Sequence, residues 1–238
     1  MLIIPTMKRH LIFWLLNLTL LNNSVSQEIS QVGMHRDILK VIPHGWIVRD
    51  SAQGDLNKDG KADIVLMIQS DVPADYRKND SFGSDSINAN KRGLFIFFQH
   101  QDGYKFIKEA DKIIPEHVTP TISDTYSGIN IKNGILETAY YYWANAGSWL
   151  TYTTTYKFRY QNNDFFLIGI EYESTHRGNM IEENVSINLS TRKLYIETIE
   201  PSDKQDLVES EWKQFNLENL PSISEVIPSQ YKILNRYY

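Results

Sequence analysis

The chain has 238 residues, and 24 Lys and Arg against 29 Asp and Glu give it a formal net charge of −5. Acidity without a local block of basic residues argues against binding to nucleic acid or to an anionic membrane surface. The chain contains no cysteine, which excludes disulfides and thiol catalysis and favours a bacterial periplasm or exterior over an exported eukaryotic setting, where disulfides are common.

Residues 1–26 have the pattern of a secretory signal peptide. Two basic residues precede the apolar stretch 11–21, and small residues follow up to Ser26. The apolar stretch is shorter than the roughly 20 residues that span a membrane, so we expect cleavage after Ser26; a signal anchor is the alternative. The mature protein is then exported, periplasmic or extracellular, without stable membrane insertion. Met7 is an alternative start of translation.

Residues 27–238 predict one mainly β domain of medium size. Ile64–Ile68 is a continuous apolar run rich in β-branched residues, as in a strand buried on both faces. We expect a short helix or irregular segment at 27–42 and a buried strand at 64–68. A long surface loop is expected at 70–92, and a hairpin at 93–108. Further strands are expected at 127–131, 135–143, 148–160, 165–172, 183–189 and 193–197.

The strands and turns together indicate about eight largely antiparallel strands. Asp102-Gly103 and Asn133-Gly134 are strong hairpin signals, because both central positions of such turns adopt a positive φ. A sandwich, a barrel and a partial propeller all remain compatible with this pattern. Near the C-terminus the apolar residues fall at helical spacing, which predicts an amphipathic helix over 203–216. Its apolar positions are Leu207, Val208, Trp212 and Phe215.

The segment 55–63 has the residue spacing of a calcium-binding loop. Side-chain oxygens stand at loop positions 1, 3, 5 and 9, position 7 offers a backbone carbonyl, and Gly60 permits the sharp turn between them. Calcium is a hard cation that takes six to eight oxygen ligands. We therefore predict a Ca²⁺ site in this loop; a solvated acidic turn is the alternative. The predicted ligands are Asp55, Asn57, Asp59, Lys61 through its carbonyl, and Asp63.

This loop differs from an EF-hand, because position 12 is Leu66 rather than the required Glu. It ends at Asp63 and leads directly into the predicted strand 64–68. In both respects it resembles the short calcium loops of FG-GAP and VCBS repeats and of integrin-type β-hairpins. With Gly128–Gly134 and the aromatic strand 148–160, the chain also resembles uncharacterised secreted bacterial β proteins. The resemblance implies a calcium-stabilised β fold outside the cytoplasm, without implying an activity, and the single loop departs from a complete propeller.

Exposed aromatic side chains are the best candidates for a partner-binding surface. The run 140–143 and the following strand are rich in Tyr and Trp, which stack on sugars or fill a partner's pockets. We predict binding through Tyr141, Trp143 and Trp149; the alternative is that these side chains belong to the core and edges of a sheet. The histidines are scattered, and no catalytic residue is assigned.

These observations predict an exported, calcium-binding, non-enzymatic β module. Its partner is expected to be a protein or a glycan of the cell envelope, and an immunity or inhibitor protein is one specific form of this hypothesis. The alternative is a calcium-stabilised hydrolase of envelope polysaccharide that uses paired acids among Glu137, Glu171 and Glu173. A purely structural role without a ligand is the third possibility.

Overall fold

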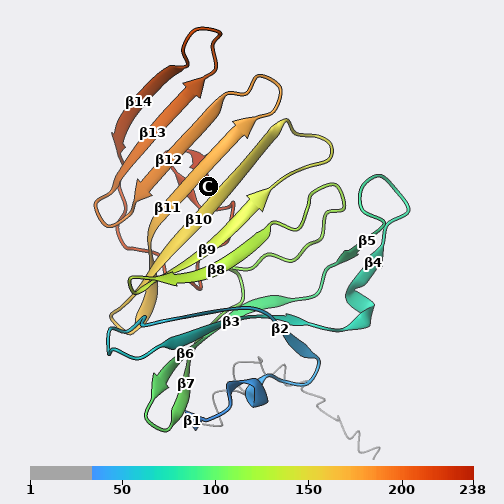
Figure 1. Cartoon of the computed structure of the whole chain (residues 1–238), viewed down its shortest axis with the longest axis vertical. Helices are drawn as coiled ribbons and strands as arrows, with labels where there is room; N and C mark the ends of the chain where they lie inside the picture. The colour runs from blue at the N-terminus through green and yellow to red at the C-terminus, as the bar shows by residue number, and fades with distance from the viewer. Residues whose placement is uncertain (1–33) are drawn as a thin grey trace, which may run out of the picture.

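The structure, a computed structural model, describes residues 34–238 and contains two main antiparallel sheets (Figure 1). The predicted signal peptide lies outside the described residues. The smaller sheet has five strands in the order β1-β7-β6-β3-β2. Its strands are β1 (Met34–His35), β2 (Trp46–Gly54), β3 (Asp63–Ser70), β6 (Arg92–His100) and β7 (Gly103–Ala110).

The larger sheet has seven strands in the order β14-β13-β12-β11-β10-β9-β8, so neighbours in sequence are neighbours in space. Its strands are β8 (Tyr126–Lys132), β9 (Ile135–Tyr142), β10 (Leu150–Gln161), β11 (Asp164–His176), β12 (Glu182–Asn188), β13 (Lys193–Glu200) and β14 (Leu207–Gln214). The minor elements are η1 (Ile38–Val41), η2 (Pro73–Asp75), β4 (Tyr76–Lys78), β5 (Ser86–Asn88), β15 (Lys232–Ile233) and β16 (Arg236–Tyr237).

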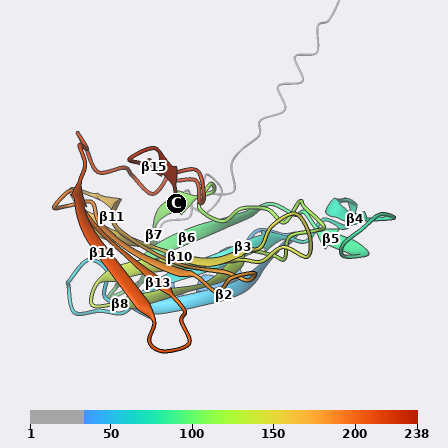
Figure 2. The same cartoon turned by 90° about the horizontal axis from the view of Figure 1, so that it is seen from above.

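The prediction of a mainly β, antiparallel fold is confirmed, but with sixteen strands among residues 34–238 instead of about eight. The predicted strand at 64–68 is β3, and all eight of its residues are buried. The expected turn at Asn133-Gly134 has φ values of +53° and +75° and joins β8 to β9. The larger sheet is curved and open, ending at β14 and β8 (Figure 2).

The predicted C-terminal helix is wrong, because 207–214 forms strand β14. This segment pairs with β13 over eight residues, from Leu207 opposite Glu200 to Gln214 opposite Lys193. Every residue of β14 is exposed, including Trp212 at 71%. Apolar spacing predicts an element only when the apolar side chains are buried, so here it carried no information. The strand pairing offered by β13 decides the conformation.

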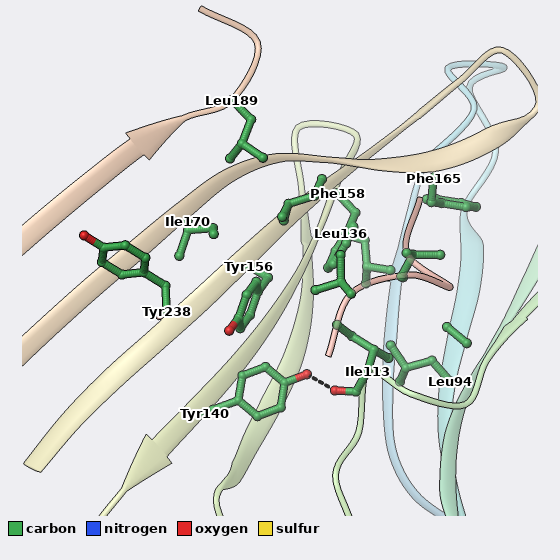
Figure 3. Packing of buried hydrophobic residues seen from close by; sticks show 14 of the residues in the cluster. Leu94, Ile113, Leu136, Tyr140, Tyr156, Phe158, Phe165, Ile170, Leu189 and Tyr238 are labelled. Carbon is green, nitrogen blue, oxygen red and sulfur yellow. Dashed lines mark hydrogen bonds between the residues drawn. The ribbon is translucent and has the colours of Figure 1, made fainter. Parts of the chain in front are cut away.

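The main core lies between the two sheets and under the C-terminal segment. The inner face of the larger sheet carries Tyr140, Tyr156, Phe158 and Ile170, all buried (Figure 3). Leu94 on β6 and Ile113 face the same core, and the Tyr140 hydroxyl donates a hydrogen bond to the Ile113 carbonyl oxygen. The chain returns after β14 to cover this inner face with Ile223, Val226, Ile233 and Tyr238. The opposite, outer face of the sheet is not part of this core.

The two sheets meet where β2 lies beside β8 without sharing a strand ladder. Both strands are irregular at this place, with register shifts between Val48 and Asp50 and between Tyr126 and Gly128. The Asp50 carboxylate fills the irregularity: its Oδ2 accepts hydrogen bonds from the Tyr126 hydroxyl at 2.8 Å and from the Ile129 amide at 3.3 Å. One side chain therefore supplies the polar link that a ladder would otherwise provide.

A second polar link holds the loop that follows β7 against β6. The Arg92 guanidinium is buried and forms a two-pronged ion pair with Asp124, with N–O distances of 2.8 and 2.6 Å. Burial alone would raise the pKa of Asp124, but the charge and hydrogen bonds of Arg92 hold that pKa below its usual range. Deprotonated Asp124 is therefore part of the folded state.

Asp50→Ala is expected to destabilise the protein by about 1–3 kcal/mol, because it leaves the Tyr126 hydroxyl and the Ile129 amide without their partner. Tyr126→Phe removes only one of these bonds and is expected to cost less. Chemical denaturation checks both values. Glu200→Ala, at an exposed carboxylate, is the control; an Asp50→Ala midpoint equal to that of this control would contradict the role of Asp50.

Acid is expected to weaken the fold through Asp124. Because its folded pKa is lowered, its contribution is complete above the unfolded value of about 3.9 and is lost as the pH falls through the folded pKa. Thermal unfolding of the wild type and of Asp124→Asn between neutral pH and pH 3 measures this contribution. The stability difference between the two proteins should shrink on acidification, and a constant difference would contradict the prediction.

Candidate functional site

The predicted calcium loop is the connection between β2 and β3, at the junction of the two sheets. Gly54 pairs with Asp63 across its base. The turn between β8 and β9 lies against the loop: a side chain added at Gly134 would come within 3.3 Å of the Asp55 carbonyl oxygen. Hairpin turns of both sheets therefore meet at this loop.

The side-chain oxygens of the first half of the loop turn inward, toward the loop's own backbone. The Asp55 carboxylate accepts hydrogen bonds from the amides of Asp59 at 3.1 Å and Gly60 at 2.9 Å. The Asn57 amide oxygen accepts from the Asp59 amide at 2.9 Å, and the Asp59 carboxylate accepts from the Lys61 amide at 2.9 Å. This inward arrangement depends on Gly60, whose φ is +83°.

Asp63 has a different environment from the other predicted ligands, because it is fully buried. Its Oδ2 accepts from the amides of Leu56 at 2.8 Å and Asn57 at 3.3 Å, and its Oδ1 accepts from the amide of Gln99 on β6 at 3.0 Å. Burial raises the pKa of Asp63, and the three amides only partly offset that rise. Asp63 thus ties the loop to the smaller sheet.

The structure brings the predicted metal ligands together only in part. Asp55, Asn57 and Asp59 share hydrogen bonds within the loop, whereas the Asp63 carboxylate is engaged by backbone amides. Over residues 34–238, no group of three or more His, Cys, Asp or Glu side chains is placed to hold a metal ion. The donor chemistry, which is all oxygen, nevertheless suits calcium.

The predicted aromatic surface divides into two parts, and Arg177 organises the larger one. Trp143 and Trp149 flank the loop between β9 and β10. The Arg177 guanidinium lies over the Trp143 ring at 5.3 Å and donates to the carbonyl oxygens of Ala144 at 3.0 Å and Ser148 at 2.5 Å. Its Nε also donates to the Trp149 carbonyl oxygen at 3.3 Å. Trp143 is consequently half-buried beneath a cation and serves to hold the loop.

Trp149 stands at the edge of a hollow that this loop encloses. Its side chain is 67% exposed, and the hollow has a volume of about 440 Å³. Its other lining residues are Asn145, Ala146, Gly147, Ser148 and Arg177. An exposed indole beside amide, hydroxyl and guanidinium groups can stack on a ring while polar groups bind its substituents.

Tyr141 lies apart from this loop, on the outer face of the larger sheet. It stands directly opposite Thr153, which stands opposite Glu173, and this row continues to Asn184. These side chains line a shallow hollow of about 190 Å³. The Tyr141 side chain is 43% exposed, whereas the Trp143 ring lies under the Arg177 guanidinium.

A tyrosine-lined cavity of about 400 Å³ was not predicted from the sequence. Tyr140, Tyr142 and Tyr152 contribute from the inner face of β9 and β10, and the rings of Tyr142 and Tyr152 stack at 4.7 Å and 8°. The remaining walls come from 115–125 and 228–230. Only the aromatic strands were visible in the sequence, because the other two walls are distant along the chain and join them through tertiary contacts.

The carboxylates considered for hydrolysis are distributed over the open outer face. Glu171 forms an ion pair with Lys157 at 2.9 Å, and Glu137 accepts a hydrogen bond from Asn130 at 3.2 Å. Glu173 lines the shallow hollow beside Tyr141, together with Glu182. Two of these three acids are therefore paired with polar neighbours on the sheet.

No protein-family model, curated protein or solved structure matches this chain. In the region from Met34 onward, no helix has the length and hydropathy needed to cross a membrane. The functional interpretation therefore depends on the geometry of the two loops.

Proposed function

We propose that this chain is an exported, calcium-stabilised and non-enzymatic β module that binds a glycan of the bacterial envelope through the loop between β9 and β10. The observation that carries the proposal is Trp149, which is 67% exposed beside a hollow of about 440 Å³. Export is supported by the signal-like pattern of 1–26.

A glycan suits this site better than a protein partner. The hollow is small and combines one exposed indole with Asn145, Ser148 and Arg177. A stable protein interface needs on the order of 1,000 Å² or more and a cluster of anchors. A sugar ring needs one flat aromatic face and a few polar groups. Arg177 holds the loop through three backbone carbonyls, which reduces the ordering cost of binding.

Calcium would have a structural role in this module. The ion would be held by Asp55, Asn57, Asp59 and the Lys61 carbonyl. Asp63 would either reorient its carboxylate to join these ligands or keep its hydrogen bonds to the loop amides and so hold the loop in place. The ion would supply positive charge to a loop with three carboxylates that lies where both sheets meet. Because β9 separates this loop from the aromatic loop by about eight residues, or roughly 25 Å of strand, the ion would not contact the glycan.

Calcium is expected to raise the melting temperature of the wild type relative to excess chelator, because it binds the folded state. The gain is about 2.7 kcal/mol at a hundredfold excess over Kd. Asp59→Ala is expected to abolish the shift, and Asp203→Ala, at an exposed acid outside the loop, is expected to retain it. Equal melting of the wild type with calcium and with chelator would remove calcium from the proposal.

Trp149→Ala is expected to weaken glycan binding at least tenfold, because the stacking surface is lost. Calorimetric titration with chitotriose, cellotriose and the soluble peptidoglycan disaccharide, with calcium present, measures this effect. Trp212→Ala is the control, since that indole is similarly exposed in a single copy of the chain but lies on β14, away from the β9–β10 loop. Failure of the wild type to bind any of the three saccharides, or equal binding by both variants, would contradict the proposed site.

A further inference from the structure

Strand β14 is an exposed edge whose side chains are also exposed. All eight residues from Leu207 to Gln214 are exposed, and three of them are large and apolar. Leu207 is 61% exposed, Val208 58% and Trp212 71%. Across the described chain, no strand pairs with the other edge of β14. One end of the larger sheet therefore presents both unpaired backbone groups and apolar surface.

The common devices that protect sheet edges are weak here. Natural edges are usually very short, bulged, or interrupted by proline. The ladder between β13 and β14 instead continues in unbroken register through eight pairs, and the segment contains no proline. Lys213 is the one basic residue on the strand, and it lies against Glu211 of the same chain. Such an edge is suited to pairing with another strand.

Symmetry restricts how two copies of β14 could pair. A two-fold antiparallel pairing that extends a sheet has its axis perpendicular to the sheet, because only this axis reverses the strand direction and keeps each face on the same side. Directly opposite residues share a face, so the register must be centred on a single residue, which then lies opposite its own copy.

Charge selects one of these registers. Centres at Glu209, Glu211 or Lys213 place a charged residue opposite its own copy, and a centre at Ser210 places Glu209 opposite Glu211 twice. Centres at Leu207, Val208 or Gln214 overlap only one to three residues of the strand. A centre at Trp212 opposes no like charges. It places Glu211 opposite the partner's Lys213 twice, Ser210 opposite the partner's Gln214 twice, and the two indoles opposite each other. Opposite charges and aromatic pairs at such positions are stabilising, whereas like charges are destabilising.

We propose that two copies of this chain associate through antiparallel pairing of β14, in the register centred on Trp212. Trp212 already packs against Tyr195 of β13, with ring centroids 5.0 Å apart. In the dimer each indole lies between this tyrosine and the partner's indole, so its exposed apolar surface is covered. The result is one continuous sheet across both copies, with the two aromatic loops free because they lie on the connection between β9 and β10.

Charge reversal tests this register in the full exported chain. Sedimentation velocity over a concentration series is expected to show a dimer for the wild type. In Glu211→Lys, both 211–213 pairs across the interface become pairs of lysines. In Lys213→Glu, both become pairs of glutamates. Each variant is expected to weaken dimerisation at least tenfold, because like charges then lie opposite each other. The double variant E211K/K213E restores opposite charges and is expected to restore the dimer. All three variants should retain the wild-type circular dichroism spectrum, because β14 is fully exposed.

Glu209→Lys discriminates between the registers. In the proposed register Glu209 falls outside the charged pairs, so this variant is expected to remain dimeric. Loss of the dimer in Glu209→Lys, or failure of the double variant to recover, would overturn the register. A wild type that remains monomeric at all concentrations would overturn the proposal. Saccharide binding by Glu211→Lys is expected to equal that of the wild type, which separates this inference from the proposed function.

Discussion

The packing of β2 beside β8 is the constraint on which the rest of the structure depends. Two sheets that share no ladder there must still satisfy the backbone groups of two irregular strands. The Asp50 carboxylate links them by accepting hydrogen bonds from the Tyr126 hydroxyl and from one backbone amide of β8, that of Ile129. With this junction closed, one face of each sheet contributes to a common core, and the C-terminal segment completes it.

The predicted calcium loop lies at this junction and contacts elements of both sheets. The loop follows β2 directly, contacts the β8–β9 turn near Gly134, and is tied to β6 through Asp63 and the Gln99 amide. An ion bound there would stabilise the meeting point of three structural elements. The proposed glycan site lies at the other end of β9, where Arg177 holds the loop around Trp149. In this proposal, stabilisation and recognition occupy opposite ends of one strand.

The two edge strands of the larger sheet, β8 and β14, differ in whether another element covers them. At β8 the edge is covered by β2 and joined to it by the half-buried Asp50 carboxylate. At β14 the edge is open, and its apolar side chains are exposed. The same difference explains why sequence patterns predicted β8 correctly and β14 incorrectly. Apolar periodicity reports burial, and β14 is held by backbone pairing to β13 without burying any face.

The sequence by itself determined the local features: the buried strand at 64–68, the hairpin turn at Asn133-Gly134 and the loop at 55–63, because each depends on residues adjacent in the chain. Tertiary structure alone decided the strand state of 207–214, the tyrosine-lined cavity and the burial of Asp63. It also placed Arg177 over Trp143, across 34 positions of the chain. The strand state of 207–214 depends on pairing with β13, and the other features depend on contacts between segments that are distant in the chain. None of these contacts can be read from the spacing of residues within one segment.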